Sequence, residues 1–371
     1  MTIPVSSGTI AASQIRTEFG PSGDGTAVSL GNYRVSFNNT SQEGTLSNLP
    51  LDAGIPQSGA IAMSDFYDKS LNIVVDVHSG AANEYGVNAK AKYNGTNTHT
   101  VIGGFKDRQV KGSRIIINVN KKLGSHPPAG TGPDNFNKSA NTATSKCALR
   151  TGTWGSGGNA AAKVEVRFGN SAKLYGAGGK GGNGSNGNSQ TGQKGGNGGS
   201  GFGVQHAGTL LYLSSGTVIK RGFGGGGGGG HANETSKNNR SASGGGGGGG
   251  AGFPAGFKGI GGTDGTNGGS GNSGTLTKHG NAGEGGNNAG EAVGGDGGRG
   301  ADSEATTAEA GTKGNSSGGE GTSGGGAKGN NGTGIRTTVG GSGNGSANTY
   351  LFVTGNAGTV DNKNSPGTTV S

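Results

Sequence analysis

The sequence predicts a fold that is mostly β and irregular, with almost no α-helix. A small β-rich N-terminal region is followed by a bundle of polyglycine-II helices. Three observations carry this prediction. Glycine stands at every third position from Gly256 to Gly274. The glycines are unevenly placed, since residues 1–150 hold 17 of the 91 and the rest of the chain holds 74. Alternating apolar stretches, such as residues 164–168, run directly into glycine.

The glycine period selects the type of helix. A period of three fits neither the α-helix, at about 3.6 residues per turn, nor the strand, at about two. It fits a helix of the polyproline-II type, which brings every third residue to one edge. Collagen would also need abundant proline, and after residue 150 the chain has only Pro254 and Pro366. We therefore expect glycine helices that hydrogen-bond to one another within one chain. Backbone hydrogen bonds, each worth about 1 kcal/mol net, would then replace a large apolar core.

Composition excludes several classes of protein. The hydrophobic content is 27% and the formal net charge is +9, yet no dense run of Lys or Arg is present. We interpret this charge as a soluble surface and expect no nucleic-acid partner. The single cysteine, Cys147, excludes an internal disulfide framework and a cysteine-based zinc cluster. No apolar run of about 18 residues and no secretory leader is visible, so we expect no membrane insertion and release by lysis.

The first 70 residues contain a repeated element. Residues 3–15 and 55–66 align at an offset of 51 from the Ser-Gly pair onward, as in Ser7 and Ser58. Each copy has a Ser-Gly turn, then apolar residues behind a serine that is suited to capping a short helix. The repeat is either a docking element or a staple for the N-terminus. The candidate attachment residues are Ile3, Pro4, Ile10, Ile15, Ile55, Pro56, Ile61 and Phe66.

The remaining chain divides at the rise in glycine. We predict a β-rich domain over residues 71–175, with strands in 71–80, 114–124 and 163–168, and a glycine-rich bundle with variable loops over 176–371. A second strand pair in 209–220 also leads into glycine. The expected connections between glycine helices are residues 231–243, 275–279, 301–317 and 333–339. The pattern leaves open whether the run from Gly256 to Gly274 is one helix or folds in its middle.

No chemistry of an enzyme stands out in the sequence. The six histidines are scattered, without the spacing of a metal site, and acidic residues are sparse and unpaired. The glycine runs contain GxGxxG trivially, but none follows a strand and opens a helix. We expect no catalytic activity, no metal and no cofactor.

A rigid scaffold that displays loops is suited to binding. The loop between the two heptaglycine runs is the strongest candidate for receptor contact, with a second near residue 278. Their candidate residues are His231, Asn233, Lys237, Asn238, Asn239, Arg240, Lys278 and His279. Aromatic residues beside glycine runs are further candidates, although we favour a packing role for Phe253 and Phe257. The aromatic candidates are Phe202, Tyr212, Phe223, Phe253, Phe257, Tyr350 and Phe352.

Two resemblances point to a tailed phage. The string IP-x-SG-x-I-x-x-S-x-F/I, carried by residues 55–66, resembles phage tail and tail-fibre proteins. Residues 176–345 resemble the receptor-recognising adhesins at the tail-fibre tips of T-even-type phages. Those adhesins form a sandwich of polyglycine-II helices between variable loops. The N-terminal 70 residues differ from them.

The resemblance implies a tail-fibre or tail-tip adhesin in the virion, extracellular after host lysis. Residues 1–70 would dock to other tail or fibre proteins, and the bundle would bind an outer-membrane protein or polysaccharide of the host. One alternative is a structural tail or decoration protein that uses the bundle as a stiff spacer. Another is an ice-binding protein, for which the threonines near residue 263 do not form a repeating face.

Overall fold

The computed structural model describes most of the chain after residue 163 and shorter stretches before it. The described residues are 8–19, 30, 56, 59–67, 73–77, 84–85, 87–88, 101–102, 114–125, 147–152, 163–187, 190–234, 240–288, 291–317, 321–337, 350–353, 358–361 and 368–370. Within these ranges, the helical elements are α1 (Ala12–Phe19) and the 3-10 turn η3 (Met63–Phe66), with Leu30 also in a 3-10 conformation, and strands prevail. The prediction of a mostly β protein with almost no helix is therefore confirmed.

Three sheets share the strands of the β region, and nearly all of their pairings are parallel. The first sheet has the order β21 (Thr368–Val370), β19 (Tyr350–Val353), β11 (Thr209–Leu213), β8 (Lys163–Phe168), β5 (Arg114–Val119), β1 (Ile73–Val77) and β4 (Val101–Ile102). The second has the order β2 (Glu84–Tyr85), β6 (Lys122–Gly124), β9 (Lys173–Tyr175), β12 (Val218–Lys220) and β20 (Thr359–Val360). The third has the order β18 (Ile335–Arg336), β10 (Ser200–Gly203), β7 (Cys147–Arg150) and β3 (Val87–Asn88). The antiparallel exception is β4 against β1.

The chain visits these sheets in a fixed order, so it winds as a solenoid. Each circuit passes from the first sheet to the second and then to the third, as in β5, β6, β7 and again in β8, β9, β10. Neighbouring strands in a sheet come from successive circuits, which is why they pair in parallel. Repeating circuits of this kind bury one continuous core between them. We call this region the β-solenoid.

Apolar side chains stack in register inside the β-solenoid. In the first sheet Ile117 pairs with Val166 and Val166 with Leu211. The second sheet stacks Leu123, Leu174 and Ile219 in the same way. All of these side chains belong to one buried cluster, together with Phe168 and Phe202, whose rings meet edge to face at 5.5 Å. The alternation predicted for residues 164–168 reflects this inward face, because every second residue of a strand points to the same side.

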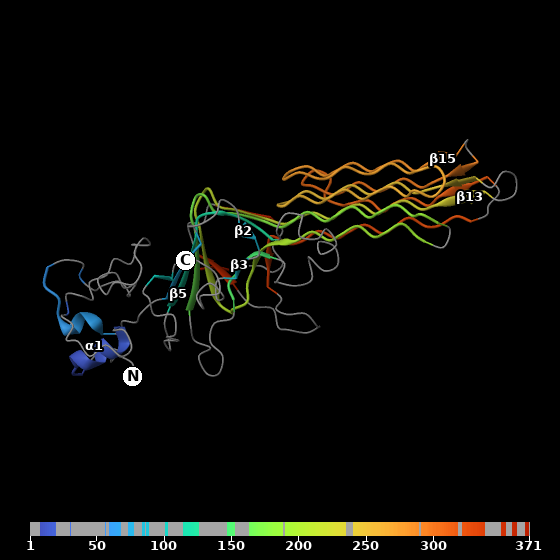
Figure 1. Cartoon of the computed structure of the whole chain (residues 1–371). Coiled ribbons are helices and arrows are strands. Elements are labelled where there is room, and N and C mark those ends of the chain that lie inside the picture. The colour runs from blue at the N-terminus through green and yellow to red at the C-terminus, as the bar shows by residue number, and fades with distance from the viewer. Residues whose placement is uncertain are drawn as a thin grey trace.

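The glycine-rich segments are two insertions at one corner of the β-solenoid. Residues 176–199 lie between β9 and β10, and residues 221–334 lie between β12 and β18. Both therefore leave the second sheet and return to the third. The structure differs here from the predicted division at residue 175, since strands from both predicted domains pair in the same sheets. Figure 1 shows the insertions running side by side away from the sheets.

We call these inserted segments the glycine-rich bundle. Its segments in chain order are residues 176–187, 190–199, 222–230, 243–251, 255–262, 266–275, 278–286, 294–302, 308–314 and 323–334. Donors recur every third residue. The N–H groups of Gly178, Gly181 and Gly184 donate to the carbonyls of Pro254, Phe257 and Ile260 at 2.7–2.9 Å. The N–H groups one residue later donate to a different segment, 223–229. Each segment therefore forms hydrogen bonds to neighbours in more than one direction.

The long run from Gly256 to Gly274 folds in its middle. The N–H groups of Gly268, Gly271 and Gly274 donate back to the carbonyls of Gly262, Gly259 and Gly256, so the two halves are antiparallel. Gly265 turns the chain with a φ of +74°, a backbone conformation that glycine adopts without steric cost. This settles the alternative that the period left open: the run is two segments joined by a turn.

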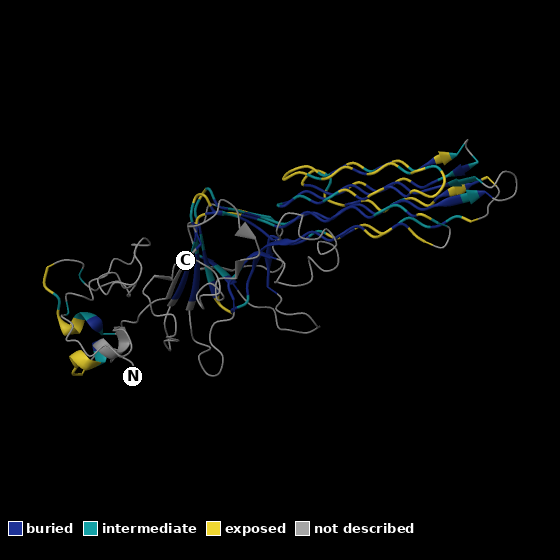
Figure 2. Cartoon of the chain, viewed as in Figure 1, coloured by how far each residue is buried: buried dark blue, intermediate teal, exposed yellow. Residues whose placement is uncertain are grey.

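The two heptaglycine runs lie at the centre of the bundle. Segment 222–230 hydrogen-bonds to six other segments, and so does segment 243–251. The six partners of the first are 176–187, 190–199, 243–251, 294–302, 308–314 and 323–334. A side chain has no room in these runs. A Cβ on Gly226 would lie 1.9 Å from the carbonyl oxygen of Gly298, and one on Gly247 would lie 2.3 Å from that of Gly226. Figure 2 shows buried segments inside and exposed residues on the outer ones.

Outer segments keep glycine where they face a neighbour and carry polar residues elsewhere. Segment 294–302 repeats two glycines and one outward residue, Asp296 and then Arg299. The outward side chains accept hydrogen bonds from the backbone of the next segment. Asn183 Oδ1 accepts from the N–H of Ile260 at 3.0 Å, and Asn186 Oδ1 from that of Thr263 at 2.8 Å. Ser273 does the same for Lys258 at 3.2 Å. These contacts satisfy donors that have no glycine segment beside them.

The connections of the bundle gather at its two ends. The proximal turns, residues 252–255, 275–279 and 302–307, lie toward the β-solenoid. The distal end carries β13 (Ala232–Glu234), β14 (Arg240–Ala242), β15 (Asn287–Asn288), β16 (Ala292–Val293) and β17 (Asn315–Ser316). The predicted loop 301–317 is therefore a proximal turn followed by a further segment, 308–314. The glycine pattern did not predict that segment, because its first inward position is occupied by buried Ala308 instead of glycine.

The two N-terminal copies adopt the same turn. Gly8 and Gly59 both have positive φ, at +117° and +78°. The N–H of Ala11 donates to Gln14 Oε1 at 2.7 Å, and the N–H of Ala62, 51 residues later, donates to Asp65 Oδ2 at 2.7 Å. The cap is thus Gln14 or Asp65 rather than the expected serine. The Tyr67 hydroxyl of the second copy donates to the carbonyl of Gly8 in the first.

The close packing of segments predicts that alanine substitution at two nearby glycines changes the free energy of unfolding by very different amounts. A Cβ on Gly326 would lie 2.1 Å from the carbonyl oxygen of Gln193, whereas one on Gly324 would meet nothing closer than a Thr191 methyl at 3.6 Å. We expect Gly326→Ala to lower the free energy of unfolding by about 3 kcal/mol. Gly324→Ala should leave it within about 1 kcal/mol of the wild type. Calorimetric unfolding of both variants measures this, and equal losses would contradict the packing described.

Candidate binding surface at the distal end of the bundle

Two small sheets build the distal end. The hairpin β13–β14 forms one, with Asn233 opposite Ser241, and the antiparallel strands β15, β16 and β17 form the other. Ala232, Ala242 and Ala292 are fully buried where the two sheets meet. Alanine suits this position because the glycine segments behind it bring the strands too close for a larger side chain. Figure 1 places β13 and β15 together at this end, far from α1.

A buried carboxylate joins the two sheets. Glu234 is 1% exposed, and its Oε2 accepts from the Ser316 hydroxyl at 3.0 Å and from the Ser317 hydroxyl at 3.4 Å. A carboxylate in this position needs such donors, because an unpaired buried charge is costly. Glu234 therefore holds β17 against the hairpin.

His231 is a second buried link. Its side chain is 2% exposed, and its Nε2 lies 3.5 Å from Asp264 Oδ2. Its backbone N–H donates to the Ser323 hydroxyl at 2.7 Å, and its carbonyl accepts from the N–H of Ser323 at 2.9 Å. Burial lowers the pKa of His231, while the nearby Asp264 carboxylate opposes the shift. His231 thus ties three turns together, which differs from the expectation that it projects toward a receptor.

Polar groups face outward around these links. Arg240 Nη1 lies 3.2 Å from Glu291 Oε2, and both side chains are about a third exposed. Asn233 is half-buried, and its N–H donates to the carbonyl of Gly321 at 3.1 Å. Asn287, Asn315, Ser317, Thr263 and Asp264 are exposed. Amides, hydroxyls and mixed charges of this kind can form hydrogen bonds with a polar partner. Three further candidates, Lys237, Asn238 and Asn239, lie outside the described residues.

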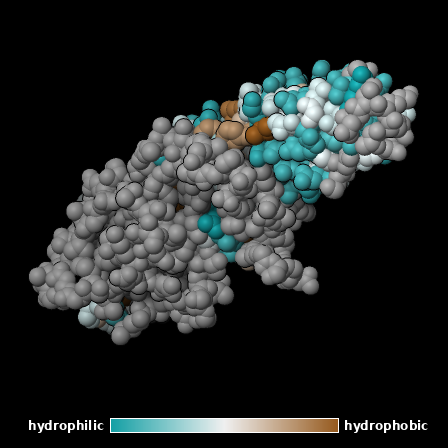
Figure 3. All heavy atoms as spheres, turned by 45° about the vertical axis from the view of Figure 1, so that its right-hand side comes forward, coloured by the Kyte–Doolittle hydropathy of each residue, from teal (hydrophilic) through white to brown (hydrophobic). Residues whose placement is uncertain are grey.

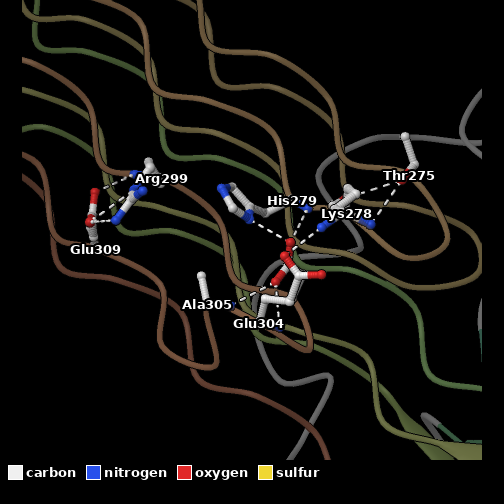
Figure 4. Close-up of polar contacts among 8 residues, drawn as sticks. Thr275, Lys278, His279, Arg299, Glu304, Ala305 and Glu309 are labelled. Carbon is white, nitrogen blue, oxygen red and sulfur yellow. Dashed lines mark hydrogen bonds and ion pairs between the residues drawn. The ribbon is translucent and has the colours of Figure 1, made fainter.

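Lys278 and His279 lie at the other end of the bundle, in a proximal turn. The structure therefore does not bring them together with His231, Asn233 and Arg240. His279 Nδ1 lies 2.7 Å from Asp302 Oδ2, and Lys278 Nζ lies 2.6 Å from Glu304 Oε2 (Figure 4). Both contacts join turn 275–279 to turn 302–307. These side chains serve to fix the proximal turns.

Asp302 is the centre of this proximal cluster. Its side chain is 1% exposed and accepts from the backbone N–H groups of Ala305 and Glu304 at 2.8 Å and of His279 at 3.1 Å. Burial opposes the ionised form, but these three donors and the His279 ring outweigh it and hold the pKa of Asp302 well below its usual range. Beside it, Arg299 forms a two-pronged contact with Glu309 at 2.6 and 2.9 Å.

The aromatic candidates lie away from the distal end. Phe202, Phe223, Tyr350 and Phe352 are buried, and Tyr212, Phe253 and Phe257 are half-buried. The Phe253 ring lies in a proximal turn, with Lys122 Nζ of β6 at 3.9 Å from its centroid. This placement agrees with the packing role that we favoured for Phe253.

The candidate attachment residues are mostly inward-facing where the structure describes them. Ile10, Ile15 and Phe66 are buried, while Pro56 and Ile61 are half-buried. Ile3, Pro4 and Ile55 lie outside the described residues. The buried side chains stabilise the repeated turns, so any partner would contact other groups of this region.

The described residues hold neither a metal-ligand cluster nor a helix suited to a bilayer. Within them, no three His, Cys, Asp or Glu side chains gather closely enough to hold a metal ion. No helix in the described ranges has both the length and the apolar character needed to cross a bilayer. Burial raises the pKa of the Cys147 thiol to about 12, against the opposing charges of Arg336 and Arg150, so this cysteine is an inert core residue.

Sequence reasoning missed Glu234 and Asp302, the two carboxylates that hold the turns. Asp302 carried a usable signal, since it follows Asp296 and Arg299 at the same spacing of three in segment 294–302. Glu234 carried none, because its partners Ser316 and Ser317 are about 80 residues away in the chain.

Comparisons with known proteins found one solved structure. No family model matches the sequence, and no curated protein matches it. The chain is similar to the crystal structure of the gp37-gp38 adhesin tip complex of the bacteriophage S16 long tail fibre. The identity is 19% over 83% of this chain and 90% of that one, with a TM-score of 0.33.

Asp302 predicts a measurable pH dependence. Because its pKa is lowered in the folded state, its stabilising effect is present at neutral pH and is lost as the pH falls below about 4. Asp302→Asn should lower the free energy of unfolding at pH 7 by about 2 kcal/mol and flatten its acid dependence. Denaturant titrations between pH 7 and pH 3 measure both effects, with Glu284→Gln, which changes an exposed carboxylate of an outer segment, as a control. If the free energy of unfolding fell by the same amount between pH 7 and pH 3 in Asp302→Asn and in the wild type, this assignment would be contradicted.

Proposed function

We propose that the protein is an adhesin of a phage tail fibre or tail tip, and that the distal end of its bundle binds a receptor on the host-cell surface. It would act in the virion tail, outside the cell after host lysis, as a binding protein without catalysis, cofactor, nucleic-acid partner or membrane insertion. Its receptor would be an outer-membrane protein or a polysaccharide. The proposal rests on the geometry of the bundle and on the motif resemblance.

We infer that the segments of the bundle are polyglycine-II helices. The support is the three-residue recurrence of donors, with N–H groups 178, 181 and 184 directed to one neighbour and 179, 182 and 185 to another. A bundle bonded in this way resists bending, because displacing one segment breaks hydrogen bonds to several others. Such a rod holds its distal turns in fixed positions, which lowers the entropic cost of binding.

One observation carries the proposal most directly: chain connections far apart in sequence converge at the distal end and are locked there by buried groups. His231, Glu234 and Ser323 make these links, and their contacts leave Asn233, Arg240, Asn287 and Asn315 on or near the surface. A scaffold that orders polar turns at one end is a recurrent design for recognition. We assign receptor contact to this surface, and Lys237, Asn238 and Asn239 remain predicted members of it.

The opposite end would attach to the particle. The repeated turns of residues 1–70 lie far from the distal end (Figure 1), so one end can dock while the other is exposed. We propose that this region binds other tail or fibre proteins, with Ile10, Ile15 and Phe66 as its internal support. Tyr67, which bonds the second copy to Gly8 of the first, would keep the two copies in one docking unit.

The second candidate is a structural tail component that uses the bundle as a spacer. The continuous backbone hydrogen bonding of the bundle favours it, because stiffness alone would explain a rod. The two candidates differ in whether the chemistry of the distal surface matters to host attachment.

An adsorption assay separates them. We expect phage particles that carry Asn287→Arg and Asn315→Arg to lose at least about tenfold in adsorption rate, because two bulky cations would disrupt a fitted polar contact. The matched control carries Asn281→Arg and Ala310→Arg, which place the same charges on exposed positions along the side of the bundle. Normal adsorption of the distal variant, with the protein present in the particle, would favour the spacer. Equal loss in both variants would show a general effect of charge and would also count against the distal contact.

A further inference from the structure

A cleft of about 380 Å³ lies where the β-solenoid meets the proximal turns. Its floor is the outer face of the second sheet, with Tyr175 at the end of β9 and Lys220 at the end of β12, paired in register. Its opposite wall comes from the proximal turns and includes Leu276, Thr277 and Ser303. The volume falls in the lower part of the range for small-molecule sites, about 300–1,000 Å³.

The wall of this cleft is held in place. Thr277 and Ser303 flank the proximal cluster, in which Asp302 binds the N–H groups of His279, Glu304 and Ala305 (Figure 4). The floor is fixed by the parallel pairing of β9 with β12 and of β12 with β20. A cleft with both sides anchored keeps its shape without a ligand, as preformed sites do.

The charges in the cleft leave one cation in excess. Arg221 Nε lies 3.3 Å from Asp361 Oδ2, so these two lining residues offset each other. Lys220, which is half-buried, forms no ion pair with any carboxylate of the described residues. A cation beside low-dielectric walls attracts an anion more strongly than one in open water.

The cleft also presents apolar and hydroxyl groups side by side. The Tyr175 ring is half-buried, and Leu276 is 37% exposed, which makes it one of the large hydrophobic residues most exposed in the described part of the chain. On the face drawn in Figure 3, the hydrophobic residues of the otherwise polar bundle gather at its proximal end. The hydroxyls of Thr277, Ser303 and Thr359 line the same space.

We propose that this cleft binds an acidic pyranose, a sugar ring that carries one carboxylate or phosphate. The apolar face of the ring packs on Tyr175 and Leu276, its hydroxyls bond to Thr277, Ser303 and Thr359, and its acid group lies at Lys220. A neutral sugar leaves Lys220 without a partner, and a small inorganic anion leaves the apolar surfaces uncovered. This site is separate from the distal surface and does not depend on receptor binding there.

Ligand-observed NMR and calorimetry on the full chain test the proposal, with galacturonic acid, glucose 6-phosphate, galactose and glucose as probes. We expect at least one acidic sugar to bind about fivefold more tightly than its neutral counterpart. Comparison of galacturonic acid with glucose 6-phosphate distinguishes a carboxylate site from a phosphate site. Binding of neither acidic sugar would overturn the proposal.

Variants assign the binding to the cleft. Lys220→Gln should remove the preference for the acidic sugar, whereas Lys194→Gln, which deletes an exposed lysine of the bundle, should leave it unchanged. Tyr175→Leu should weaken acidic and neutral sugars alike, and thermal unfolding confirms that the variants stay folded. Equal effects of Lys220→Gln and Lys194→Gln would show attraction to net charge and would overturn the site.

Discussion

The structure depends on the close approach of one backbone to another. In the centre of the glycine-rich bundle, a carbonyl oxygen of one segment occupies the space where a Cβ of the next would stand, as Gly298 does at Gly226. Only glycine permits that distance, and the distance permits hydrogen bonds in every direction around segments 222–230 and 243–251. The entropic cost of ordering glycine is offset by this number of bonds, each of modest net value. A conventional apolar core remains in the β-solenoid, where the chain alternates its side chains.

This constraint also separates scaffold from surface. Inward positions of the central runs hold glycine, and the segment ends also hold alanine and serine, such as Ala251, Ser243 and Ser323, so larger side chains stand mostly at outward positions and in turns. Outward residues such as Asn183 and Asp296 accept hydrogen bonds from neighbouring backbone, which joins the polar surface to the fold. The turns at the two ends then differ in role. Asp302 fixes the proximal turns to one another, and Glu234 and His231 fix the distal turns on which the proposed receptor contact rests.

Much of the fold could be predicted from the periodicity of the sequence. The parts that could not be predicted were missed for physical reasons. The period of three indicated the glycine segments, and the alternation at Val164, Val166 and Phe168 indicated an inward strand face that the core confirms. The winding of the β-solenoid was hidden, because an insertion of more than a hundred residues separates β12 from β18 within one circuit. The residues predicted to form one binding site lie at opposite ends of the bundle for a similar reason. Lys278 and His231 both follow glycine runs, but the chain reverses direction at each turn, so successive turns alternate between the two ends.

Hydrogen–deuterium exchange of the two heptaglycine runs tests the central claim most directly. Their amides lack any side-chain protection, so slow exchange requires the hydrogen bonds between segments. We predict that the amides of Gly225–Gly229 and Gly245–Gly249 exchange as slowly as those of the core strands β8 and β11. Exchange of these glycine amides at the rate of a flexible glycine linker would contradict the account.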